Sequence, residues 1–159
     1  MIKTGDAIPA LKLTAATAAG PKEVTTDDLF GGKTVVLFAV PGAFTPTCSM
    51  QHMPSYLQNM DALRAKGVDT VACLAVNDVF VMDAWRKHLG VDEQVVMLAD
   101  GSAAMTQALG LEFDLTARGL GIRSQRYVMV VRDGKVAHLA VEAPGAFDVS
   151  KAESVLAVL

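Results

Sequence analysis

Thr34-Val35-Val36-Leu37-Phe38-Ala39-Val40 is the stretch that decides the fold of this chain. Every residue after Thr34 is apolar, which is typical of a strand buried on both of its faces. Such strands occur mainly in parallel sheets, whose two faces are covered by helices. The stretch therefore predicts an α/β protein.

The same order of elements continues along most of the chain. Further apolar strands are predicted at residues 68–76 and 95–98. Helices are predicted at about residues 46–66, 80–89 and 102–109, and a glycine follows each of them: Gly67, Gly90 and Gly110. Glycines in these places favour left-handed caps that end helices.

The last third of the chain has a different pattern. Apolar runs at residues 126–131 and 135–141 flank Asp133-Gly134, a strong hairpin signal. A final helix is predicted at residues 150–159, with Ser150 as its N-cap and Glu153 completing a capping box. A β-α-β-α-β-α order followed by a hairpin and a helix predicts one domain over residues 1–159. The expected architecture is a mixed sheet with helices on both faces, of which the thioredoxin-like fold is the simplest form.

Composition narrows the class of protein. The chain has 159 residues, is 52% apolar and carries a net charge of −3, so a phosphate backbone is not an expected partner. No apolar run reaches the ~20 residues that cross a bilayer, and no targeting signal is recognised. Two cysteines form neither a disulfide scaffold nor a four-thiolate metal site. We therefore expect a cytoplasmic protein without a membrane or nucleic-acid partner, a metal or a bound cofactor.

The connection after the first predicted strand, residues 41–47, is the sharpest candidate for chemistry. Active sites of open α/β sheets lie at such strand ends. Thr45 followed by Pro46 predicts a helix start, which places Cys48 in the first helical turn. Free backbone N–H groups and the helix dipole favour a thiolate there. The Thr45 hydroxyl, three residues earlier, can bond the sulfur, whereas a small buried cysteine is the alternative interpretation.

These residues resemble the peroxiredoxins. Pro41, Thr45 and Cys48 match the spacing of the family's active-site pattern, and Pro-Gly-Ala-Phe-Thr-Pro-Thr-Cys-Ser at residues 41–49 is similar to the five/plant type II subfamily. The resemblance extends through residues 72–78, 98–102, 109–111, 119–121 and 123–127. It implies a thiol peroxidase of thioredoxin-like fold whose cysteine attacks hydrogen peroxide or a small organic hydroperoxide and becomes a sulfenic acid.

The resemblance also assigns roles to residues. It makes Cys48 the peroxidatic cysteine, Thr45 the hydroxyl that bonds substrate and thiolate, and Pro41 the residue that shields the site. The family arginine corresponds to Arg126, with Arg123 ranked second. A planar guanidinium beside the sulfur would stabilise a thiolate and polarise the peroxide bond.

Regeneration and assembly are also expectations from the resemblance. Residues 142–159 lack the C-terminal resolving cysteine of animal members, and Cys73 lies within a predicted buried strand. The expected reductant is therefore an external thiol, either glutathione with glutaredoxin or thioredoxin. The family also implies a homodimer. A peroxide-sensing protein without efficient turnover is the alternative function.

His52 lies four residues after Cys48, so the two share one face of a helix. A cysteine–histidine pair could indicate a thiol hydrolase, although no orienting Asn or Asp motif accompanies it. The other interpretations are support for the active-site loop and a core or capping histidine. A metal site is not expected, because no third ligand accompanies the pair.

Overall fold

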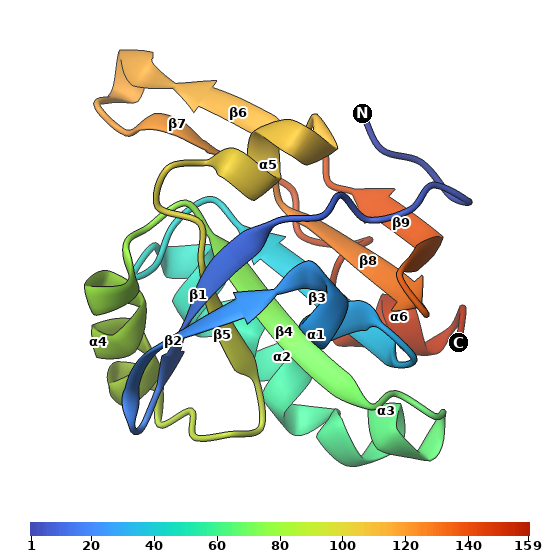
Figure 1. Cartoon of the computed structure of the whole chain (residues 1–159). Coiled ribbons are helices and arrows are strands. Elements are labelled where there is room, and N and C mark those ends of the chain that lie inside the picture. Colours follow the sequence, from blue (N-terminus) through green and yellow to red (C-terminus); the bar gives the residue numbers. More distant parts are fainter.

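A computed structural model describes residues 1–159 and contains one large mixed sheet (Figure 1). Its seven strands lie in the order β2-β1-β5-β4-β3-β8-β9. The strands are β1 (Lys12–Thr17), β2 (Gly20–Thr25), β3 (Thr34–Val40), β4 (Thr70–Ala75), β5 (Val96–Ala99), β8 (Tyr127–Arg132) and β9 (Lys135–Val141). β3, β4 and β5 are parallel, whereas β1 and β8 pair antiparallel with β5 and β3. The predicted mixed α/β sheet is confirmed.

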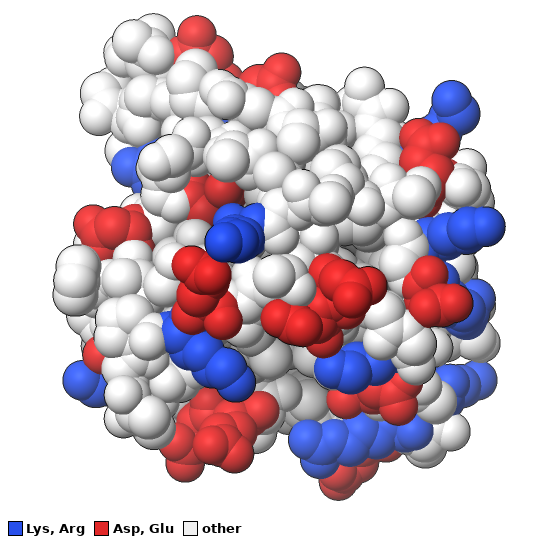
Figure 2. All heavy atoms as spheres, viewed as in Figure 1, with Lys and Arg blue, Asp and Glu red and all other residues white.

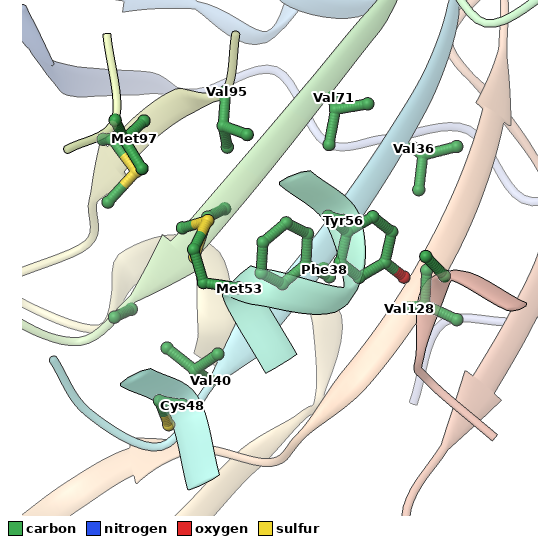
Figure 3. Packing of buried hydrophobic residues seen from close by; sticks show 14 of the residues in the cluster. Val36, Phe38, Val40, Cys48, Met53, Tyr56, Val71, Val95, Met97 and Val128 are labelled. Carbon is green, nitrogen blue, oxygen red and sulfur yellow. The ribbon is translucent and has the colours of Figure 1, made fainter. Parts of the chain in front are cut away.

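β3 lies near the centre of the sheet because its side chains are apolar on both faces. Val36, Phe38 and Val40 pack in one core, and Val35, Leu37 and Ala39 pack in the other. This alternation is what a continuous apolar strand requires. In the first core the rings of Phe38 and Tyr56 stack 4.1 Å apart, and Cys48 lies beside Val40 (Figure 3).

Helices cover both faces of the sheet, as predicted. The first core is closed by the π-helix η1 (Cys48–His52), α2 (Met53–Gln58), α3 (Met60–Ala65), α4 (Val79–Leu89) and α6 (Ala152–Leu156). The second core is closed by α1 (Thr26–Phe30) and α5 (Ala104–Leu109). Gly90 and Gly110 cap α4 and α5 in the left-handed conformation, which confirms two of the predicted caps.

Two predicted helices differ from the observed ones. The segment predicted as one helix at residues 46–66 contains a π-helical turn and is interrupted at Asn59, whose side chain donates to the Ser55 carbonyl. The final helix is shorter than predicted, and its N-cap is Lys151, without a side-chain bond. The predicted capping box is wrong because the Ser150 hydroxyl donates to Glu142 instead.

Several elements have no counterpart in the sequence-based prediction. These are the β1–β2 hairpin, α1, the 3₁₀ turn η2 (Thr116–Arg118) and the hairpin of β6 (Glu112–Leu115) and β7 (Gly121–Ser124). The β6–β7 hairpin forms a separate two-stranded sheet that stands away from the large one (Figure 1).

Charges on the surface are mixed. Figure 2 shows acidic and basic side chains interspersed over the lower part of one face, while fewer charged atoms are visible in the upper part. No helix has both the length and the apolar character needed to cross a membrane.

Candidate active site

Strand pairing brings two distant segments to one edge of the sheet. β3 ends at Val40, and its residue Ala39 pairs with Tyr127, the first residue of β8. Because β8 runs antiparallel to β3, Arg126 lies beside the loop that follows Val40. The loop and the arginine therefore meet where α/β sheets usually carry their active sites.

Cys48 lies at the start of the helical segment, as predicted. Pro46 and Thr47 are helical, and the π-helix η1 begins at Cys48. The Cys48 side chain is fully buried. The Thr45 hydroxyl lies 2.8 Å from Cys48 Sγ and 2.7 Å from the Gly42 carbonyl, so it bonds the sulfur rather than a backbone N–H of the helix start.

Arg126 completes the surroundings of the sulfur, since its Nη2 donates to Cys48 Sγ over 3.1 Å. Arg123, the second-ranked arginine, instead donates to the carbonyls of Leu120 and Val76. The structure thus brings Cys48, Thr45 and Arg126 together and leaves Arg123 outside their contacts. The Thr45 hydroxyl and the Arg126 guanidinium thus both lie within hydrogen-bond distance of the Cys48 sulfur.

His52 orients Arg126. Its Nδ1 accepts from Arg126 Nη1 at 2.8 Å, and its Nε2 lies 3.1 Å from the Ser150 carbonyl. Burial, followed by the nearby Arg126 charge, lowers the pKa of His52 from 6.5 to about 3. At neutral pH the imidazole is therefore uncharged, with its proton on Nε2. The interpretation as support for the site is the one that this geometry favours over a hydrolase base.

A cavity of about 300 Å³ opens beside the arginine. It is lined by Pro41, Thr47, Phe113, Gln125, Arg126 and the loop at residues 142–146. Cys48 and Thr45 do not line it, and the Cys48 side chain is buried. Of the predicted site residues, Pro41 and Arg126 face the opening.

Cys73 lies away from the opening, in the middle of β4 with no exposed surface. Both cysteines are free thiols. Burial raises the pKa of the Cys73 thiol well above its usual value, which makes it a poor nucleophile. The expectation that Cys73 is buried and unbonded to Cys48 is confirmed.

The loop between β9 and α6 contains site residues that the sequence did not suggest. Ser150 accepts bonds from His52 and Tyr56, and its own N–H and hydroxyl are held by Glu142. The local pattern marks Ser150 only as a helix N-cap, because its partner His52 is 98 residues away in sequence.

Comparisons with known proteins agree with this geometry. The Redoxin family model matches residues 3–156. Peroxiredoxin-2E, chloroplastic, of Arabidopsis thaliana is 46% identical over 99% of this chain and 69% of its own length. Peroxiredoxin-2B of the same plant is 49% identical over 82% of this chain and 81% of its own. The crystal structure of reduced Prx3 in complex with hydrogen peroxide, from Vibrio vulnificus, is 51% identical, covers 99% of both chains and superposes with a TM-score of 0.94.

The family model and the first and third of these relatives cover nearly the whole chain, including the segments that carry Thr45, Cys48 and Arg126. The chain therefore belongs to the redoxin family, and within it to the peroxiredoxins of the five/plant type II subfamily, which are thiol-dependent peroxidases.

Proposed function

We propose that Cys48 is the peroxidatic cysteine and that Thr45 and Arg126 assist it. The observation that carries this proposal is that one sulfur receives a hydroxyl at 2.8 Å and a guanidinium nitrogen at 3.1 Å. Hydrogen bonds from a charged donor are stronger than neutral ones, so Arg126 stabilises the thiolate most.

In the proposed reaction the Cys48 thiolate attacks one peroxide oxygen. An S–O bond forms while the O–O bond breaks, so the sulfur is oxidised and the peroxide is reduced. The departing oxygen takes a proton and leaves as water or an alcohol, and Cys48 becomes a sulfenic acid. Arg126 stabilises charge that develops on the departing oxygen. Thr45 has one hydroxyl proton, which it gives to the thiolate or to Gly42 according to the state of the sulfur.

The cavity supports hydrogen peroxide and small organic hydroperoxides as substrates. Its wall contains Phe113, Ala143 and Pro144, which suit a short alkyl group. The related Vibrio vulnificus Prx3 is described in complex with hydrogen peroxide. Pro41, Thr47 and Arg126 line the cavity while Cys48 is buried, so we expect Pro41 to limit the access of water to the sulfur.

Stopped-flow fluorescence tests the proposal. Trp85 is the only tryptophan, and its Nε1 donates to Ser49, next to Cys48, at 2.9 Å. We expect peroxide to change its emission rapidly in the wild type and not in Cys48→Ser. A wild-type rate equal to that of free cysteine would contradict the peroxidase assignment and favour the sensor alternative.

We also propose that glutathione with glutaredoxin regenerates the enzyme, because Cys73 is buried and residues 142–159 contain no cysteine. One thiol displaces water from the sulfenic acid to form a mixed disulfide, and a second thiol releases Cys48. Peroxide turnover with glutathione and glutaredoxin should exceed turnover with thioredoxin and its reductase. The reverse order would assign thioredoxin as the reductant. A cytoplasmic location, where such thiols are abundant, belongs to the same proposal.

A homodimer is proposed from exposed apolar residues near the site. Phe80 is 76% exposed and Phe44 49% exposed, and Leu120 is also exposed. Large apolar side chains exposed in this way are typical of an interface between two protein chains. Sedimentation at micromolar concentration should give twice 16.7 kDa, and Phe80→Glu should shift it toward the monomer. A monomeric wild type would contradict this proposal.

A further inference from the structure

Glu142, the residue after β9, holds the loop that leads to α6. One of its oxygens, Oε2, accepts from the Asp148 N–H at 2.7 Å, the Ser150 N–H at 2.9 Å and the Ser150 hydroxyl at 2.7 Å. Only 7% of the residue is exposed. A buried carboxylate with three donors on one oxygen fixes the position of Ser150 in particular.

The carbonyl of Ser150, whose position Glu142 fixes, is bonded in turn to His52. It accepts from the Tyr56 hydroxyl at 2.6 Å and from His52 Nε2 at 3.1 Å. Phe38 and Phe147 lie against the imidazole with ring centroids 4.8 and 5.0 Å away, which restricts its rotation. With its proton on Nε2, the ring must offer Nδ1 as an acceptor.

That acceptor determines where Arg126 points. Arg126 Nη1 donates to His52 Nδ1 at 2.8 Å, which directs Nη2 at Cys48 Sγ. None of the ion pairs in the structure involves Arg126. The guanidinium is thus oriented by a neutral ring, so its charge is not offset by a carboxylate partner and acts on the sulfur.

We propose that Glu142 is a positioning residue for peroxide reduction, acting through Ser150 and His52 to aim Arg126 at Cys48. This inference rests on the proposed function of Cys48 and Arg126. It assigns a rate effect to a carboxylate that touches neither the sulfur nor the arginine.

The ionisation of Glu142 is consistent with this role. Burial acts to raise the pKa of Glu142, but bonds from the Ser150 hydroxyl and from the N–H groups of Asp148, Ser150 and Val149 outweigh it and hold the pKa below its usual value. The side chain is therefore a charged acceptor at neutral pH, and its three bonds to the loop persist.

A double-mutant cycle tests the inference. Glu142→Ala is made alone and in combination with Arg126→Gln, and the second-order rate of Cys48 oxidation by peroxide is measured by Trp85 fluorescence. A misplacement of about 1 Å at a reacting centre can cost roughly 100-fold in rate, so we expect Glu142→Ala to slow oxidation by about tenfold. In the Arg126→Gln background the same change should matter less than about twofold, because no guanidinium is left to aim.

Two further variants complete the design. Glu142→Gln keeps an acceptor oxygen and should restore most of the rate, whereas Glu153→Gln, at an exposed position of α6, is the matched control and should oxidise as the wild type does. Where Glu142→Ala fails to fold, Glu142→Asp takes the place of that variant in the cycle. Its side chain is one methylene shorter, so the carboxylate oxygen no longer reaches as far. Equal losses in both backgrounds would overturn the inference, since they indicate a general structural effect. A wild type that oxidises no faster than free cysteine would overturn the proposed function instead.

Discussion

Acid should destabilise this protein through His52 in a way that can be calculated. The residue has no exposed surface, and burial with the Arg126 charge lowers its pKa from 6.5 to about 3. Between these two values the unfolded chain binds a proton at this histidine and the folded protein does not. The stability that the neutral imidazole contributes is therefore fully present above pH 6.5 and is lost as the pH falls toward 3.

The size of the effect follows from the gap between the two pKa values. A pH of 5 lies about 1.5 units below the pKa of the histidine in the unfolded chain, and each unit corresponds to about 1.4 kcal/mol of stability. The folded protein should therefore lose about 2 kcal/mol between pH 7 and pH 5 from this residue alone. This loss of stability at pH 5 has the same size for any pKa of His52 in the folded protein that lies well below 5.

Urea unfolding followed by Trp85 fluorescence measures this loss, at one protein concentration and at both pH values. His52→Asn is the informative variant, because its Oδ1 takes the place of Nδ1 as an acceptor for Arg126 and it cannot titrate. We expect the wild type to lose about 2 kcal/mol more than His52→Asn between pH 7 and pH 5. His88→Asn removes an exposed histidine and should follow the wild type. The reasoning is refuted where the wild type and His52→Asn lose equal free energy, since His52 would then be protonated in the fold.

Four other substitutions give separate expectations. Arg126→Gln should slow Cys48 oxidation by roughly 100-fold and Arg123→Gln by less than about threefold in stopped-flow assays, because only Arg126 donates to the sulfur; equal losses would contradict this. Cys73→Ala should keep most glutathione-dependent turnover, and lost turnover with an intact first oxidation would make Cys73 a resolving cysteine. Tyr127→Phe should raise the free energy of unfolding by about 1 kcal/mol, because the buried Tyr127 hydroxyl has no partner; a decrease measured in urea would show that the hydroxyl is bonded.

The sequence predicted the central strands because they are continuous apolar runs, and it predicted the place of Cys48 because Thr45-Pro46 marks a helix start. The β1–β2 hairpin escaped prediction since Lys12–Thr17 is Lys-Leu-Thr-Ala-Ala-Thr and its turn contains Ala18-Ala19 rather than a strong turn pair. Small residues give little strand signal, and the sheet itself stabilises them.

The missed parts of the site have a different cause. Ser150 has the local pattern of a helix N-cap, but Glu142 captures its hydroxyl through a contact that forms only when the chain folds. Similarly, the role of His52 depends on Ser150, 98 residues later. Local patterns report local bonds, and the support of Arg126 is made almost entirely of distant ones.

The pairing of β3 with β8 also sets when Cys48 meets Arg126 during synthesis. Cys48 and Arg126 are 78 residues apart in sequence. At ribosomal rates of about 5–20 residues per second, the cysteine emerges roughly 4–16 s before the arginine that donates to its sulfur. Until β8 docks beside β3, the growing polypeptide carries Cys48 without its cationic partner. The Arg126–Cys48 contact can therefore form only after most of the chain has been translated.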